Sequence, residues 1–347
     1  MAADDTPSTS TNNGTLNAEN RSDEPICLTR AEQQEAEDDA KGFPKNRFKH
    51  GINKLWHIPP ALKTGQPVKL GIDEAGRGPV LGPMVYAAAF WKVEEDDAMI
   101  AMGFDDSKAL DEKTRDGLFQ RMLRTHEQVG WVIHSIPATE VAGKMLMREP
   151  TSLNKISHDS AADMLSLVLA EGVCVTEVFV DTVGDPDTYQ RKLEGLFGHH
   201  TPAIAFTVAK KADSLYKTVS AASIAAKVTR DRAIRDWVWE EDFPQALSTD
   251  FGSGYPGDAR CAEWLRKNSN PVFGFPSLVR FSWSTTRELM EKECVGVEWE
   301  EEEENGGLPA GTASIEAFVK PKADGPKKAR KRAKYFQQRG METVGDF

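Results

Sequence analysis

Two adjacent carboxylates, Asp73 and Glu74, stand between an apolar segment and a glycine-flanked arginine. The preceding residues 68–72 alternate apolar with small or polar side chains, which predicts a strand that carries both acids to its end. Successive side chains of a strand point to opposite faces, so two neighbouring acids cannot both sit comfortably in a core without an ion or partner. A surface turn is the alternative, but the apolar residues before and the glycines after favour a divalent-metal or acid/base site.

Two further acids follow predicted strands in the same way. Asp181 comes directly after Val178-Phe179-Val180, and Asp213 lies between a strand predicted over 204–208 and a long helix. Functional groups of open α/β sheets collect at the carboxyl ends of the strands, so we expect these acids at one edge. The alternative for Asp213 is a helix N-cap.

Four acids gathered at one edge would repel one another strongly. At ~4 Å, two like charges cost roughly 4 kcal/mol at an effective dielectric constant of 20. Such a cluster needs cations, and carboxylates without histidine or cysteine select Mg²⁺ or Mn²⁺. Two such ions about 4 Å apart are the established arrangement for in-line phosphodiester displacement.

The elements that position these acids alternate in type. Strands are expected at 68–73, 84–91, 131–133, 178–180 and 204–208, the second antiparallel to the first, and helices at 111–127, 138–148, 153–171 and 217–241. Asp111 is a plausible N-cap, and Gly172 ends the third helix. The small residues 219–226 predict close packing of the last helix on the sheet. The fold class is α/β, with a mixed five-stranded sheet flanked by helices.

Composition sets the outer limits. The chain has 347 residues, 39% of them hydrophobic, and a net charge of -11, most of it in two acidic stretches. Four scattered cysteines form no C-x-x-C pair, and no apolar run approaches the ~20 residues that span a bilayer. We therefore expect an intracellular protein with no membrane contact. The predicted domains are a disordered acidic tail 1–45, a catalytic domain 65–245, a helical C-terminal extension 246–297 that completes the substrate site, an acidic flexible linker 298–326 and a basic partner-docking tail 327–347.

The residues Asp-Glu-Ala-Gly-Arg-Gly-Pro-Val-Leu-Gly-Pro at 73–83 resemble the signature of type 2 ribonucleases H. Four more blocks match in order: Asp106-Ser107-Lys108, Val180-Asp181-Thr182, Lys211-Ala212-Asp213 and Gly252-Ser253-Gly254-Tyr255-Pro256. The resemblance covers roughly residues 65–295. Residues 273–283 and 335–342 look like the C-terminal region of the catalytic (A) subunit of the eukaryotic heterotrimeric enzyme.

The resemblance implies an RNase H-like fold and an endoribonuclease that cuts RNA in RNA–DNA hybrids. It also implies incision 5′ to single ribonucleotides in duplex DNA, with 3′-hydroxyl and 5′-phosphate ends, in ribonucleotide excision and primer removal. Asp73, Glu74, Asp181 and Asp213 would be the ligands of two Mg²⁺ or Mn²⁺ ions. Gly76, Arg77 and Gly78 would sense the ribose 2′-hydroxyl through main-chain groups, and Tyr255 would stack on the next deoxyribose. Two non-catalytic subunits, of B and C type, are the implied partners, and the nucleus the implied compartment.

The remaining polar residues have either a binding or a packing role in the prediction. Ser107, Lys108, Lys211 and Lys227 are possible phosphate contacts, although an Asp-Ser pair before a helix is also an ordinary cap. A solvated helix face is expected for Arg230 and Arg232, and packing for His158.

Competing functions remain open at this stage. A non-catalytic nucleic-acid-binding scaffold of the same fold is disfavoured because all four acids are present. A dinucleotide-binding oxidoreductase fails because Leu81 stands where the third glycine belongs. A transposase or resolvase of this fold class would not need Gly76-Arg77-Gly78 with Tyr255. The cluster 327–332 is interpreted as an import signal, a phosphate contact or a solubilising tail.

Overall fold

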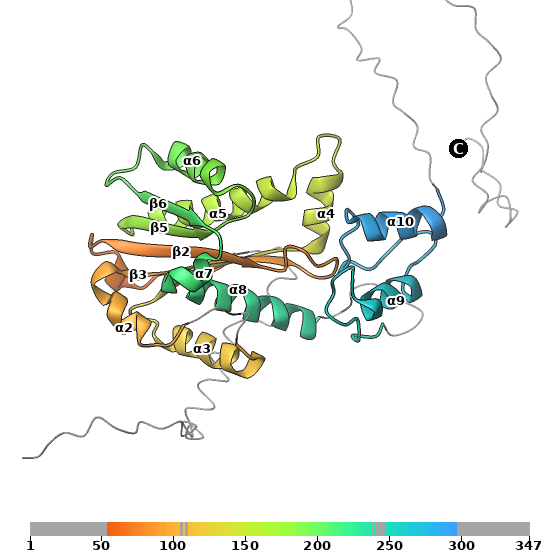
Figure 1. Cartoon of the computed structure of the whole chain (residues 1–347), viewed down its shortest axis with the longest axis horizontal. Helices are drawn as coiled ribbons and strands as arrows, with labels where there is room; N and C mark the ends of the chain where they lie inside the picture. Colours follow the sequence, from red (N-terminus) through yellow and green to blue (C-terminus); the bar gives the residue numbers. More distant parts are fainter. Residues whose placement is uncertain (1–53, 105–106, 108–109, 238, 240–246, 297–347) are drawn as a thin grey trace, which may run out of the picture. The chain divides into compact units, whose positions relative to one another are not determined.

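The computed structural model describes residues 54–104, 107, 110–237, 239 and 247–296. One mixed sheet runs through this part of the chain, in the spatial order β1-β4-β3-β2-β5-β6 (Figure 1). Its strands are β1 (Lys54–His57), β2 (Val68–Ala75), β3 (Met84–Lys92), β4 (Gly130–Ile136), β5 (Val175–Asp181) and β6 (Ala205–Ala209). The first four strands of the chain pair antiparallel, whereas β2, β5 and β6 run parallel. The parallel half therefore brings three strand ends to one edge.

Helices fill the connections. They are α2 (Asp96–Ile100), α3 (Glu112–Arg124), α4 (Ala138–Leu146), α5 (Leu153–Ala170), α6 (Pro186–Phe197), α7 (Ala212–Leu215), α8 (Lys217–Arg235), α9 (Ala259–Lys267) and α10 (Ser284–Glu293), with short 3₁₀ turns at Pro60–Leu62 and Val93–Glu95. None of the helices in the described ranges combines the length and the apolar character that crossing a bilayer requires.

The alternation of side chains along β2 assigns a face of the sheet to each layer of helices. Leu70 and Ile72 belong to the main core, together with residues of α5 and α6. Gly71, between them, faces α8, because a Cβ built on it would lie 2.3 Å from the backbone nitrogen of Val219. In the view of Figure 1, α5 and α6 lie on one side of the sheet, and α8 and α3 on the other. The expected close packing of the small residues 219–226 is confirmed by the burial of all eight.

A second, smaller core joins the segment after β2 to the C-terminal helices. It contains Val80, Leu81, Trp264, Leu265 and Leu278 among its buried members. An isolated antiparallel bridge pairs Leu81 with Val279. The helical C-terminal extension therefore packs directly on the connection between β2 and β3.

The predicted elements are largely confirmed, with some corrections. The sheet has six strands rather than five, because the short edge strand β1 pairs with β4. The strand that carries the first acids continues to Ala75, two residues past the expected end at Asp73, so Glu74 also lies within it. Helices α2, α6 and α7 were not predicted, and the helix expected to reach residue 241 ends at Arg235. Asp111 is confirmed as the N-cap of α3, since its side chain accepts a hydrogen bond from Thr114 N.

The predicted tail 1–45, linker 298–326 and basic tail 327–347 lie outside the described residues, as does Lys108.

Candidate metal-dependent nuclease site

Three of the four predicted acids meet where β2 and β5 end. These strands are parallel neighbours in a register that pairs Ile72 with Val180. The acids that follow these two residues, Asp73 and Asp181, therefore lie next to each other. Asp73, Glu74 and Asp181 each place a carboxylate oxygen within 4.8 Å of the other two. Asp73 is buried, whereas Glu74 and Asp181 are partly exposed. The three side chains form the acidic cluster of the site.

Asp73 and Glu74 reach this cluster from opposite faces of β2. Asp73 shares the face of Gly71, against α8, and the hydroxyl of Ser223 lies beside it. Glu74 is directly opposite Tyr86 of β3, whose ring belongs to the core under α5. The two adjacent strand residues still serve one site, because both carboxylates lie within 4.8 Å of that of Asp181.

The electrostatics of Asp73 indicate a site suited to a cation. Burial, then the charges of Glu74 and Asp181, raise the pKa of the Asp73 carboxyl well above its usual range, while Ser223 and the Glu74 N–H oppose that shift. Oδ1 accepts a hydrogen bond from Glu74 N at 2.7 Å. Among the described residues, no donor lies within hydrogen-bonding geometry of the buried Oδ2. An ion held by hard oxygen ligands would satisfy Oδ2 and relieve the repulsion, so the residues present fit Mg²⁺ or Mn²⁺.

Asp213 lies next to this cluster but not in it. It is buried in the first turn of α7, after Lys211, whose φ of 57° puts a left-handed residue at the turn. The N–H of Ala212 donates to Asp181 Oδ1 at 2.8 Å, which ties the start of α7 to the cluster. Three of the four expected acids are thus grouped by their carboxylate distances, and Asp213 follows directly after the residue that bonds Asp181. It is not a helix N-cap, because the residue at that position of α7 is Lys211.

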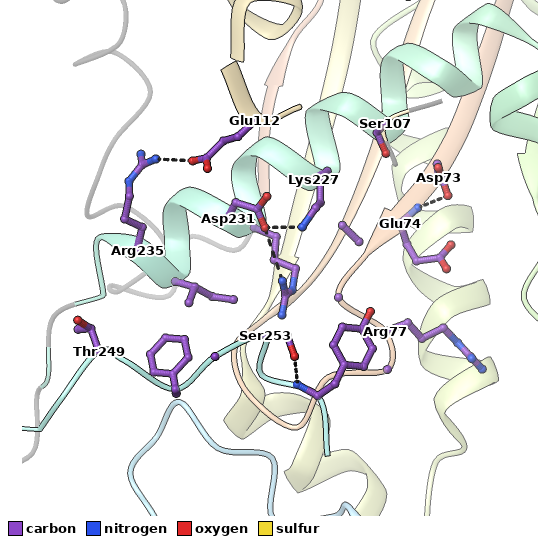
Figure 2. Close-up of a pocket in the computed structure, with 18 of the residues that line it drawn as sticks. Asp73, Glu74, Arg77, Ser107, Glu112, Lys227, Asp231, Arg235, Thr249 and Ser253 are labelled. Atoms are coloured by element: carbon purple, nitrogen blue, oxygen red, sulfur yellow. Dashed lines mark hydrogen bonds and ion pairs between the residues drawn. The ribbon is translucent and has the colours of Figure 1, made fainter. Parts of the chain in front are cut away.

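The acidic cluster lies at one end of a cleft of about 730 Å³ (Figure 2). The cleft is lined by parts of the chain far apart in sequence, among them Gly76, Arg77, Gly78, Ser107, Lys227, Ser253 and Tyr255. Lys227 donates to Asp231 at 2.7 Å, and Ser107 shares a 2.8 Å hydrogen bond with Ser223. Lys211 is exposed and is not among the residues that line the cleft.

The connection from residue 76 to residue 82, here called the glycine loop, forms one wall of the cleft. Gly76 has a φ of 79°, and a Cβ there would overlap the side chain of Arg230, so this position requires glycine. A Cβ built on Gly78 would lie 3.1 Å from Tyr255 Cε1, which places the half-exposed tyrosine ring against the loop. Figure 2 shows Arg77 directed away from the centre of the cleft. Its guanidinium donates a hydrogen bond to Asn154 of α5.

Two buried arginines beneath the glycine loop were missed or misplaced by the sequence reasoning. Arg230 was expected on a solvated face, but it is 6% exposed and donates to Leu81 O at 3.3 Å. Burial lowers the pKa of its guanidinium. Arg280, to which no role was given, is completely buried, and burial together with the charge of Arg230 lowers its pKa to about 9. The only sequence signal for Arg280 was a single arginine between the apolar pair Leu278-Val279 and Phe281.

Of the two remaining expectations for polar side chains, one is wrong and one is confirmed. Arg232 pairs with Asp116 of α3 at 2.9 Å rather than standing free in solvent. His158 is a packing residue, as predicted: its ring stacks on Tyr189 with centroids 3.8 Å apart.

Comparison with known proteins agrees with this geometry. The family model described as Ribonuclease HII matches residues 70–286. The A-type subunit of ribonuclease H2 from Rattus norvegicus is 45% identical over 289 residues, covering 82% of this chain and 92% of that protein. Its counterpart from Homo sapiens is 43% identical over 287 residues, again covering 82% and 92%. A solved ribonuclease H2 from Pyrococcus horikoshii OT3 covers 65% of this chain and 98% of its own, with 29% identity and a TM-score of 0.52.

The matched range includes the acidic cluster, the glycine loop, the tyrosine and both buried arginines. The chain therefore belongs to the ribonuclease HII family of ribonuclease H hydrolases.

Proposed function

We propose that this chain hydrolyses the RNA strand of RNA–DNA hybrids and incises 5′ to single ribonucleotides embedded in duplex DNA, leaving 3′-hydroxyl and 5′-phosphate ends. The observation that carries the proposal is that one cleft holds both parts such an enzyme needs. Three clustered carboxylates lie beside a glycine loop backed by a tyrosine. The first part suits phosphodiester hydrolysis, and the second suits recognition of a sugar.

Asp73, Glu74 and Asp181 would hold the divalent ions, together with Asp213, the residue after the Ala212 N–H that bonds Asp181. Two bound ions would activate water and stabilise the leaving 3′ oxygen. The chain's own residues orient the cluster: Ala212 N–H fixes one oxygen of Asp181, and Glu74 N–H fixes one oxygen of Asp73. The bond to Asp73 leaves its buried Oδ2, which has no donor among the described residues, to face an ion.

The glycine loop and Tyr255 would select the ribose. The backbone at Gly76 and Gly78 carries no side chain that keeps a sugar away, so its polar groups can approach a 2′-hydroxyl closely. A site built to bond that hydroxyl rejects the deoxy analogue by ~10⁴ or more, because its polar groups are then left unpaired. Tyr255, half exposed and against the loop, would stack on the following deoxyribose.

The test uses the purified full-length chain on a duplex that carries one ribonucleotide and on a long RNA–DNA hybrid, with Mg²⁺ or with chelator. We expect cleavage of both with Mg²⁺ and of neither with chelator, and a product that begins with the ribonucleotide's 5′-phosphate. Asp73→Asn should nearly abolish turnover in a folded protein. Binding without Mg²⁺-dependent cleavage, both by the chain alone and by the chain with its partners, would favour the non-catalytic scaffold instead.

We also propose that the chain acts with two non-catalytic subunits in the nucleus. The support is that its relatives are named as one lettered component of ribonuclease H2, together with the basic residues 327–332 of its sequence. Deletion of 327–347 should weaken co-purification with the partners or nuclear accumulation of a tagged chain. Unchanged behaviour in both assays would refute a role for that tail.

A further inference from the structure

The carbonyl groups of the glycine loop are held from behind by residues near the start of α10. Arg280 donates from Nη2 to Gly76 O at 2.5 Å, from Nη1 to Arg77 O at 3.0 Å and from Nε to Gly82 O at 2.9 Å. Its backbone N–H donates to Val80 O at 2.9 Å. The indole Nε1 of Trp283 donates to Gly78 O at 3.0 Å. Consecutive carbonyls at 76, 77 and 78 are thus all engaged by the side chains of residues 280 and 283.

This arrangement fixes where the N–H groups of the loop point. In a planar trans peptide the C=O and the following N–H lie on opposite sides of the chain. A carbonyl at 76 that faces Arg280 sends the N–H of Arg77 the other way, and the carbonyl of Arg77 does the same for the N–H of Gly78. Arg280 is completely buried and is not among the residues that line the cleft, whereas residues 76–78 do line it. The two N–H groups are therefore turned toward the side from which a substrate enters.

Arg280 is unusual in having carbonyl partners in place of an acid. Among the described residues, no carboxylate acts on its guanidinium, which instead sits 4.8 Å from the centroid of the Trp283 ring. A buried charge without a counter-charge is costly, so packing alone does not explain it. The planar fork of five donors matches several carbonyls at once, which the point charge of a lysine cannot do.

We propose that Arg280 and Trp283 are positioning residues for ribose recognition: they hold the peptide planes of residues 76–78 so that the N–H groups face the sugar of the scissile nucleotide. The inference rests on the proposed function, since it takes the glycine loop as the part that reads the 2′-hydroxyl. It adds that the selectivity of this loop is set by residues 280 and 283, neither of which lines the cleft.

The experiment measures selectivity in binding, not turnover. Full-length Asp73→Asn protein serves as the parent, so that substrate is bound without being cut. Fluorescence anisotropy at one fixed salt concentration gives the Kd for an all-DNA duplex and for the same duplex with one ribonucleotide. The ratio of the two Kd values reports recognition of the single hydroxyl. Arg280→Lys and Trp283→Phe are then introduced into the parent.

We expect Trp283→Phe to lower the ratio about fivefold, the equivalent of one net hydrogen bond, while the phenyl ring still covers the guanidinium. Arg280→Lys should lower the Kd ratio further, because a lysine cannot replace the planar guanidinium that donates to three carbonyls. Binding of the all-DNA duplex should change little in either variant. An unchanged ratio in folded Trp283→Phe and Arg280→Lys proteins would overturn the inference, and if Arg280→Lys does not fold, Trp283→Phe alone decides.

Thr286→Val is the matched control. Thr286 is completely buried and donates to Arg280 O at 2.9 Å and Trp283 O at 2.8 Å, so its loss weakens the start of α10 without touching the glycine loop. It should lower the melting temperature and keep the Kd ratio. A ratio that falls equally in this control would show that general loosening, and not the carbonyl contacts, is responsible, which also overturns the inference. A parent that shows no preference for the ribonucleotide would instead refute ribose reading by the loop itself.

Discussion

Replacing Asp73 by asparagine should make the metal-free protein more stable while it removes metal binding. Asp73 is buried, and its carboxylate lies within 4.8 Å of those of Glu74 and Asp181. Each such pair repels by roughly 3–4 kcal/mol at an effective dielectric constant of 20. Asparagine removes the charge and keeps an oxygen for the Glu74 N–H, while its NH₂ group can donate to the neighbouring carboxylates. Partial protonation of the wild-type carboxyl and local relaxation reduce the gain to about 2 kcal/mol, or roughly 4–8 °C in melting temperature for a domain of this size.

The pH dependence gives the sign of the effect. The pKa of Asp73 is raised in the folded protein, so the folded state binds more protons than the unfolded state above the ordinary pKa of an aspartate. The stability of the wild-type metal-free protein should therefore fall as pH rises from about 4 through the raised value. In Asp73→Asn that part of the decline should disappear, so the two stability curves should diverge as pH increases.

Magnesium should reverse the order of the two proteins. A ligand at 100 times its Kd stabilises the folded state by about 2.7 kcal/mol, and the wild type should show this gain. Asp73→Asn, which lacks one ligand, should gain much less. The assay is thermal or urea unfolding in chelator and in Mg²⁺ across pH 4–8.

Two results would refute this reasoning. One is an Asp73→Asn protein that is less stable than wild type in chelator at pH 7, and the other is equal stabilisation of both by Mg²⁺. Asp258→Asn provides a control of opposite sign. Hydrogen bonds from the Ser253 N–H and hydroxyl and from the Arg260 N–H lower the pKa of Asp258 to about 2, so its replacement should destabilise the protein at neutral pH.

Three further outcomes can be measured directly. Gly71→Ala should prevent stable folding, because its Cβ would lie 2.3 Å from the backbone of Val219. The control is Gly143→Ala on α4, which has no atom within 4 Å of the new Cβ and should raise the stability by up to about 1 kcal/mol. Equal melting temperatures of the two variants would contradict the close packing of α8 on the sheet. Tyr189→Phe should stabilise the protein by about 1 kcal/mol in urea unfolding, since its buried hydroxyl has no hydrogen-bond partner among the described residues, and a loss of stability would reveal a partner. Tyr255→Ala should slow incision at a single ribonucleotide about tenfold more than cleavage of a long hybrid, and equal losses would count against reading of the junction.

The acidic cluster was predictable because its information is local. A strand pattern followed at once by an acid indicates the face and the edge of the sheet at which that acid lies. Parallel pairing of β2 with β5 then brings the acids of the two strands together. Asp213 was less predictable, since its position depends on the left-handed turn at Lys211 and the short helix α7.

The missed elements differ in how much signal they carry. β1 has only four residues and a single partner strand, too short for an alternating pattern to be recognised. α6 does carry a start signal in its sequence: Asp185 caps Thr188 N, and Pro186 occupies the first turn. An aspartate followed at once by a proline is typical of a helix start, so α6 was within reach of prediction and β1 was not.

The two arginines were beyond local reasoning. Helix α8 is covered by the sheet, by α3 and by the glycine loop, so a polar residue on it need not face solvent, and Arg230 does not. Arg280 is buried because its guanidinium meets carbonyls more than 200 positions earlier in the chain. Periodicity within a segment says nothing about a contact of that kind.

That long separation has a consequence for biosynthesis. Arg280 lies 203 and 204 positions after the carbonyls of Arg77 and Gly76 that it holds. At a synthesis rate of about 5–20 residues per second, the loop waits roughly 10–40 s after it is made before its support leaves the ribosome. During that interval a nascent chain can build the sheet and its carboxylates while the glycine loop is still unsupported. The support of the glycine loop is thus produced only after almost all of the described residues.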